Sequence, residues 1–253
     1  MKITWLGQSG YLLEGDGQRL VLDPFFSDIV ERKLGLRRLL PPPCTIASLT
    51  PDALLITHDH LDHYDPETVV AIMAMFPACR LIGPASVMAH GAQAGLAADR
   101  LVPLASGETR QSGRVAISAT PARHSDPSSV GLLIQFATDL LWFSGDTLYF
   151  PELSPQVLRL ARRSPDIALV CINGRLNNMC AVDAVRLMAE LQPRLAVPTH
   201  YGMFAENTAD PSGFLTACAL LNQPAAVLCH GRAEESASLL AGAAGLQTPQ
   251  ARL

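Results

Sequence analysis

Apolar positions recur along the chain in short blocks that are separated by turn residues. Blocks rich in leucine or β-branched residues predict a meander of strands over 3–7, 11–14, 19–23 and 53–57. Helices are predicted from residue 66, with Pro66 in a first turn, and from residue 85. Further strands are predicted over 100–104, 114–120, 130–136 and 139–143, followed by a helix that begins near 151. The last third alternates predicted strands at 168–172, 195–199 and 225–229 with helices at 181–191 and 211–221.

The way the predicted strands are connected indicates the fold class. Strands of the first half are joined by short turns, whereas those of the last third are separated by helices, which predicts an α/β fold of mixed sheets covered by helices. Neither an internal repeat nor a low-complexity linker interrupts the pattern, so one domain over residues 1–253 is predicted. The alanine-rich segment after Glu234 predicts a terminal helix and a tail.

Composition and charge narrow the classes of partner. The formal net charge is −4, with 19 Lys+Arg against 23 Asp+Glu, so the chain lacks the basic footprint that nucleic-acid binding requires. No run approaches twenty apolar residues, and polar residues and glycines break up the amino-terminal stretch, so neither a membrane span nor a signal peptide is predicted. The six cysteines include no CxxC pair, which is typical of buried thiols in a reducing compartment, and a cytoplasmic location is expected.

The nine residues THDHLDHYD, at 57–65, contain three of the seven histidines of the chain. His58, His60, Asp62 and His63 directly follow a predicted apolar strand, and in a strand-to-helix turn such side chains can surround one point in space. Imidazole nitrogens and carboxylate oxygens are ligands that zinc, manganese and iron accept, and the lack of a thiolate argues against a structural zinc site. The pattern therefore favours a metal site over a polar turn without a metal.

Nine residues do not complete a coordination sphere, and three further candidates lie downstream. His124 follows the strand predicted at 114–120, Asp146 follows the strand at 139–143, and His200 follows the strand at 195–199. Each lies at the carboxyl end of a predicted strand, which is the edge where loops build sites in layered α/β folds.

The motif HxHxDH, followed by His124, by Asp146 in SGDT and by His200, resembles the metallo-β-lactamase superfamily. That resemblance implies a four-layer αββα sandwich with its metal at one edge. The stretches WLGQSGYLLE, LDPFFSD, CINGRLNN and PTHYGMFAENTADP are similar to the L-ascorbate-6-phosphate lactonase family within the superfamily, and they span nearly the whole chain. The chain is shorter than members of that family, which puts part of the family's substrate pocket in question.

The resemblance also implies a ligand set and a cofactor. It assigns His58, His60 and His124 to one metal position, Asp62, His63 and His200 to a second, and Asp146 to a place between them. One or two divalent ions are expected, manganese or zinc, and the donor set does not exclude iron. Because related lactonases form oligomers, the resemblance also implies a homo-oligomer.

Hydrolysis is the reaction that such a site predicts. A divalent ion makes hydroxide available near neutral pH and stabilises the oxyanion that forms on a ring carbonyl. Together with the resemblance, this predicts a lactonase that opens a phosphorylated sugar-acid lactone such as L-ascorbate 6-phosphate, with Asp62 and His200 as catalytic residues and a small anionic molecule as partner. The alternatives are a phosphodiesterase acting on a small phosphodiester and a metal-binding protein without turnover.

Several residues outside the ligand set are candidates for substrate-binding or structural roles because of their positions in the sequence. The predicted substrate contacts are Asn173, Arg175 and Tyr201. The alternative is that Arg175 ties a loop through backbone carbonyls and that Tyr201 packs over the sheet. Residues 27–49 are basic and contain three successive prolines, which predicts a surface excursion that is either a solvated loop or a cover for an anionic substrate. Structural roles are expected for His90 and His230, and GQSG at 7–10 is predicted to be a tight turn between strands.

Overall fold

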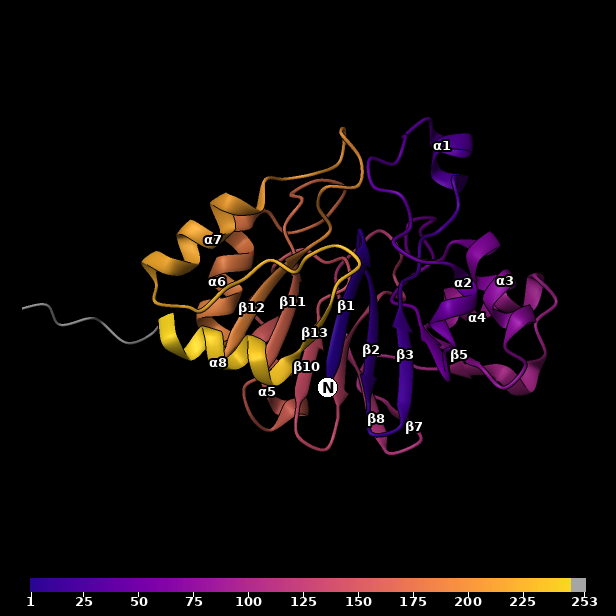
Figure 1. Cartoon of the computed structure of the whole chain (residues 1–253), viewed down its shortest axis with the longest axis horizontal. Helices are drawn as coiled ribbons and strands as arrows, with labels where there is room; N and C mark the ends of the chain where they lie inside the picture. The colour runs from indigo at the N-terminus through magenta and orange to yellow at the C-terminus, as the bar shows by residue number, and fades with distance from the viewer. Residues whose placement is uncertain (247–253) are drawn as a thin grey trace, which may run out of the picture.

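Two mixed β-sheets lie at the centre of the molecule (Figure 1). The structure is a computed structural model and describes residues 1–246. The first sheet contains, in spatial order, β13 (Ala233–Glu235), β1 (Lys2–Gly7), β2 (Gly10–Gly15), β3 (Gln18–Leu22), β4 (Ala53–Leu55), β5 (Arg80–Gly83) and β6 (Leu101–Pro103). The second sheet contains β12 (Leu195–Thr199), β11 (Ile167–Cys171), β10 (Leu140–Phe143), β9 (Val130–Gln135), β8 (Val115–Pro121) and β7 (Thr109–Ser112).

Each sheet has an antiparallel part and a parallel part. Strands β1, β2 and β3 pair antiparallel, and β3, β4, β5 and β6 pair parallel. In the second sheet β7 to β10 pair antiparallel, whereas β10, β11 and β12 pair parallel. The predicted mixed sheets are therefore confirmed, and the parallel strands point their carboxyl ends toward the same edge.

Helices cover the outer face of both sheets. On the first sheet lie α2 (Ile46–Leu49), α3 (Pro66–Met75) and α4 (Ala85–Gln93), and on the second lie α5 (Leu153–Ala161), α6 (Ala181–Leu191) and α7 (Pro211–Leu220) (Figure 1). Outside these layers are α1 (Ile29–Leu34), the 3-10 turn Ala98–Arg100 and α8 (Ser236–Leu246). This arrangement confirms the predicted αββα sandwich.

The alternation of side chains along the strands builds the core. In β2, Tyr11 and Leu13 face the space between the sheets, while Leu12 packs on the opposite face among residues of α3. Tyr11 meets Phe143 of the second sheet edge to face, with ring centroids 6.0 Å apart. Because both faces of most strands are covered, the strands are apolar on both faces, as a four-layer fold requires.

The start of α3 agrees with its sequence signals. Pro66 occupies the first turn, and the Asp65 carboxylate accepts hydrogen bonds from the backbone N–H groups of Glu67 and Thr68. The same carboxylate accepts a hydrogen bond of 2.8 Å from the backbone N–H of Ser27. Asp65 therefore both caps the helix and holds the segment that carries α1 close to the loop at 57–65.

The predicted strand at 225–229 is wrong. Only Ala225 makes a β-bridge, to Ala196 of β12, and the chain then crosses to the first sheet, where His230 bridges Trp5 of β1. The segment is apolar because it crosses the core, where Leu228 is buried between the sheets. Strands β5, β7 and β13, which have three or four residues each, were not predicted.

The segment at 27–49 covers one edge of the sandwich with α1 above the sheets in the view of Figure 1. Two of its basic residues, Arg32 and Arg38, are engaged by other parts of the protein. Arg32 pairs with Glu67. The Arg38 guanidinium donates to backbone carbonyls, including that of Phe25 at 2.9 Å, and lies over the Phe25 ring. The prediction of a surface excursion holds, but Arg38 is engaged by the protein and is not solvated.

Three further expectations concern the chain as a whole. None of the helices within residues 1–246 has both the length and the apolar character of a membrane span. The predicted terminal helix corresponds to α8, while the predicted tail at 247–253 lies outside the described residues. The cysteines are free, as predicted, but Cys180 and Cys229 are exposed and only Cys79, Cys171 and Cys218 are buried.

Candidate metal centre

The predicted ligands meet at the edge formed by the carboxyl ends of the strands. His58, His60, Asp62 and His63 lie in the loop between β4 and α3. The other three follow strands of the second sheet: His124 lies after β8, Asp146 after β10 and His200 after β12. The parallel pairing of β3 with β4, and of β10 with β11 and β12, therefore brings together residues that are up to 142 positions apart in sequence.

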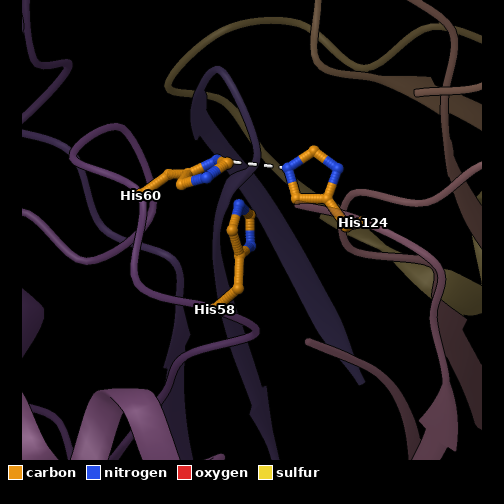
Figure 2. Close-up of side chains that lie close together, drawn as sticks. All are labelled: His58, His60 and His124. Atoms are coloured by element: carbon orange, nitrogen blue, oxygen red, sulfur yellow. Dashed lines mark hydrogen bonds between the residues drawn. The ribbon is translucent and has the colours of Figure 1, made fainter. Parts of the chain in front are cut away.

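His58, His60 and His124 form the first group. Figure 2 shows their rings converging on one point, with His58 and His60 on one segment and His124 on another. The Nδ1 atom of His60 lies 3.1 Å from Nε2 of His124. The rings of His58 and His124 are 4.8 Å apart, edge to face.

Asp62, His63 and His200 form the second group, and Asp146 lies between the two. Nε2 of His200 is 3.4 Å from Oδ2 of Asp62 and 3.1 Å from Oδ2 of Asp146. Nε2 of His63 is 3.4 Å from Oδ1 of Asp146. Asp146 also approaches the first group, since its Oδ2 is 3.8 Å from Nε2 of His124.

Four of the histidines use one ring nitrogen for a protein contact and direct the other toward the site. The Nδ1 atom of His58 contacts Thr57 Oγ1 at 3.0 Å, and that of His124 contacts the carbonyl of Asn177 at 3.1 Å. His60 uses Nε2 instead, at 3.1 Å from Ser125 Oγ. His63 donates from Nδ1 to a buried aspartate, Asp23, at 2.7 Å. Such outer contacts fix the tautomer and orientation of metal-binding imidazoles.

Asp23 was missed by the sequence analysis. It is fully buried, and its carboxylate accepts from His63 Nδ1, from the backbone N–H of Thr57 at 2.8 Å and from Thr57 Oγ1 at 2.7 Å. Only its place in the motif LDPFFSD pointed to it, and that motif supported the family resemblance without suggesting a role.

Gln8 was missed because GQSG was interpreted only as a turn. GQSG does join β1 to β2, with Gln8 at a φ of 50°. The Gln8 side chain is fully buried and donates from Nε2 to Asp62 Oδ2 at 2.8 Å, while the backbone carbonyl of Gln8 accepts from Thr199 Oγ1 at 3.2 Å. Gln8 thus ties the first sheet to Asp62 and to the end of β12.

The loop after β11 contacts the site through residues other than those predicted. The Asn178 side chain donates to Asp146 Oδ2 at 2.6 Å, and the Asn177 carbonyl contacts His124. Asn173 is buried and donates to Asn207 Oδ1 at 2.8 Å. Arg175 is exposed, and its contacts within the described residues are made by its backbone carbonyl. The substrate roles of Asn173 and Arg175 stay predictions.

Tyr201 and the two remaining histidines have packing contacts. The Tyr201 ring stacks on Trp5 with centroids 5.0 Å apart, and burial raises the pKa of its hydroxyl to about 12. His230 contacts the same Trp5 ring edge to face at 5.6 Å. Nε2 of the half-exposed His90 lies 3.5 Å from Asp59 Oδ2. The structural roles expected for His90 and His230 agree with these contacts, and the substrate role of Tyr201 stays a prediction.

Negative charge in the site is balanced by protons on two imidazoles. Burial by itself lowers the pKa of His63, but the carboxylates of Asp146 and Asp62 raise it well above its usual value. Burial also lowers the pKa of His200, but Asp146 and Asp62 together have the larger effect and raise it to about 9. Burial would raise the pKa of Asp146, yet His200 and His63 hold it well below its usual range. Because metal ligation requires neutral imidazoles, a cation bound by these residues would take the place of these protons.

The donor set and its spacing fit divalent ions. The ligand atoms of each group lie within 4.8 Å of one another, and buried His58 Nε2, His63 Nε2 and Asp146 Oδ1 have no hydrogen-bond partner among the described residues. Two ligand atoms that share a tetrahedral ion at about 2.1 Å are themselves about 3.4 Å apart. The contacts of 3.1 Å between His60 and His124 and of 3.4 Å between His63 and Asp146 match that geometry. Nitrogen and oxygen donors suit zinc, manganese or iron.

Comparisons with known proteins agree with this fold. The model of the beta-lactamase superfamily domain matches residues 18–201. A UPF0173 metal-dependent hydrolase of Deinococcus radiodurans is 30% identical over 226 residues, which cover 85% of this chain and 91% of that protein. An uncharacterized protein of Mycobacterium tuberculosis is 40% identical over 127 residues, covering 49% of this chain and only 34% of that relative. The chain belongs to the metallo-β-lactamase superfamily, in the family of UPF0173 metal-dependent hydrolases.

A solved structure shows the same fold. A metallo hydrolase from the hyperthermophilic archaeon Ignicoccus hospitalis is similar with a TM-score of 0.73 and 22% sequence identity, covering 92% of this chain and 97% of that one. At this level of identity, the similarity supports the four-layer architecture.

Proposed function

We propose that the protein is a metal-dependent hydrolase that opens a lactone or cleaves a related carboxylic ester. The observation that carries this proposal is the convergence of His58, His60 and His124 with the adjoining group of Asp62, His63 and His200 at one edge of the sheets. A divalent ion held by these residues supplies a water of lowered pKa and polarises a carbonyl oxygen.

Asp62 is the proposed catalytic carboxylate. Its side chain is 18% exposed, Gln8 donates to it at 2.8 Å, and His200 Nε2 lies 3.4 Å away. Held from these two sides, Asp62 can orient a water molecule and accept a proton from it. In the overall reaction the water oxygen bonds to the carbonyl carbon, the bond to the ester or ring oxygen breaks, and that oxygen takes the proton.

The phosphorylated sugar-acid lactone expected from the family resemblance requires a cation for its phosphate. Among the described residues that line the cavity beside Asp62, none is a lysine or an arginine. Arg175 is exposed and adjacent in sequence to Leu176, which lines that cavity, so it is the candidate. With L-ascorbate 6-phosphate as substrate, Arg175→Gln should raise KM and leave KM for an uncharged lactone unchanged.

The first experiment uses protein stripped of metal and reloaded separately with manganese and zinc. Hydrolysis of L-ascorbate 6-phosphate, of an uncharged lactone and of bis(4-nitrophenyl) phosphate is measured, with metal content determined in parallel. His60→Ala is compared with His90→Ala, because His90 is a half-exposed histidine outside the candidate ligand set. The proposal expects metal-dependent lactone opening that is lost in His60→Ala and kept in His90→Ala.

Each other outcome selects a different function. Turnover of the phosphodiester alone would replace the proposal with the phosphodiesterase alternative. Stoichiometric metal without turnover of any ester would favour a metal-binding protein. Full activity in His60→Ala would show that the assigned ligand set is wrong.

A further inference from the structure

An apolar cavity of about 320 Å³ opens beside the candidate metal centre. Its apolar walls come from four separate parts of the chain, which contribute Val30, Leu34 and Leu36, then Leu61, then Leu176, and then Phe204. The four parts belong to the 27–49 segment, to the loop that carries the ligands, to the loop after β11 and to the loop after β12. We call this space the apolar cavity.

The polar residues in its walls other than His60 and Asp62 are already engaged by the protein. Asp59 Oδ2 faces His90 Nε2 at 3.5 Å, and Asn207 Oδ1 accepts a hydrogen bond of 2.8 Å from Asn173. A ligand in the cavity therefore meets mainly hydrocarbon. Burying a negatively charged group there would cost free energy, because no lysine or arginine is among the described wall residues.

The position of the apolar cavity connects it to the reaction. His60 and Asp62, one from each ligand group, also belong to its walls. A molecule that reacts at the centre can therefore extend into the cavity without crossing a barrier of protein. The volume is at the low end of the range of about 300–1,000 Å³ for small-molecule sites, so the occupant is small.

Two exposed leucines at the rim of the apolar cavity also indicate a site for an apolar ligand. Leu34 at the end of α1 is 62% exposed, and Leu176 in the loop after β11 is 69% exposed, although both line the cavity. Large apolar side chains gathered around an opening are typical of a ligand site. Among the basic residues near this rim, Arg32 and Arg38 are bound to other parts of the protein.

We propose that the apolar cavity binds a short apolar acyl or alkyl group of the substrate, and that Leu34 and Leu36 determine this specificity. The proposal rests on the proposed hydrolase function, since it concerns a substrate of the same site. It favours an uncharged, apolar ester or lactone over a phosphorylated sugar acid.

The test measures kcat/KM for 4-nitrophenyl esters with acetyl, butyryl, hexanoyl and octanoyl groups, using manganese-loaded protein. The value should rise about fourfold for each methylene that enters the cavity, and then level off when the cavity is full. The double variant Leu34→Gln, Leu36→Gln should reduce the preference for hexanoyl over acetyl roughly tenfold, the equivalent of between one and two buried methylenes.

The matched control is Leu220→Gln, Leu221→Gln. These two leucines are 79% and 55% exposed at the end of α7, and neither lines the apolar cavity. The neighbouring Gln223 bonds to the carbonyl of Pro193, which precedes β12, so this region adjoins the amino-terminal end of that strand. The control should keep the chain-length preference of the unmodified protein.

A second readout separates failure of this inference from failure of the proposed function. Binding of acetate, butyrate, hexanoate and octanoate to the manganese-loaded protein is measured by calorimetry, which requires no turnover. Affinity that rises with chain length, and does so less in the Leu34, Leu36 variant, supports the apolar site even if no ester is hydrolysed. Equal affinity across the series would overturn the inference. Metal-dependent hydrolysis without chain-length preference would also overturn it while leaving the proposed function intact.

Discussion

Replacing Asp23 by asparagine should weaken metal binding by changing the tautomer of His63. In the native protein, Asp23 Oδ2 accepts from His63 Nδ1 at 2.7 Å and from Thr57 Oγ1 at 2.7 Å, and Oδ1 accepts from the backbone N–H of Thr57 at 2.8 Å. An asparagine must keep its oxygen toward that backbone N–H, so its NH₂ group faces His63. The His63 Nδ1 atom must then accept, and the proton moves to Nε2, the nitrogen that faces the site.

The expected loss follows from the role of such buried contacts. Removing the partner of a ligating histidine typically lowers metal affinity by about 10–100-fold. This corresponds to about 1.4–2.7 kcal/mol of binding free energy. The fold should lose less, about 1 kcal/mol, because Asp23→Asn replaces hydrogen bonds to a charged group with neutral ones and keeps the shape of the side chain.

Manganese and zinc affinities of Asp23→Asn are measured by titration against a competing chelator. Asp99→Asn serves as control, because Asp99 is an exposed aspartate outside the three ligand groups. Thermal unfolding of the metal-free proteins separates loss of affinity from loss of fold. Native affinity in a folded Asp23→Asn protein would refute the assignment of His63 as a ligand held by Asp23.

Three other predictions concern the support of the site and the fold. Gln8→Ala removes the hydrogen bond to Asp62 and should lower kcat/KM about 10–100-fold; an unchanged value would show that Asp62 needs no such partner. Gly145 and Gly17 both have positive φ, but only at Gly145 would a Cβ meet a backbone oxygen, at 2.9 Å. In thermal melts Gly17→Ala should cost about 1–2 kcal/mol and Gly145→Ala clearly more, so equal costs would contradict the crowding argument. Burial raises the pKa of Asp166, but hydrogen bonds from an arginine and a backbone amide lower it below its usual value overall. Unfolding free energies against pH should therefore show Asp166→Asn less stable than the native protein at pH 7, with the gap closing as pH falls below about 4; a constant gap would oppose this.

The strand and helix pattern could be predicted where local signals were strong. The long apolar strands of both sheets and the proline-led start of α3 follow from side-chain alternation and from capping. The segment at 225–229 has the same local pattern as a strand. The prediction was wrong because the bridging partners of this part of the chain lie on two different sheets. Whether an apolar run pairs along its length or crosses the core depends on what surrounds it.

The candidate ligands could also be predicted, since their residue types suit a metal ion and their positions follow predicted strands. His58, His60 and His63 are dense in sequence, and His124 and His200 each follow a strand. Their convergence needs only the rule that parallel strands end at one edge.

By itself, the sequence determined the sandwich architecture and which residues were candidates for a metal. Only the tertiary structure decided what supports and surrounds them: Asp23 behind His63, Gln8 against Asp62, and an apolar cavity beside the site with Leu34 in its wall. The physical reason is that ligand chemistry is carried by residue type and local spacing, whereas a supporting hydrogen bond or a cavity wall exists only where distant segments pack. Gln8 and His200, for example, are 192 positions apart and meet because the two sheets face each other.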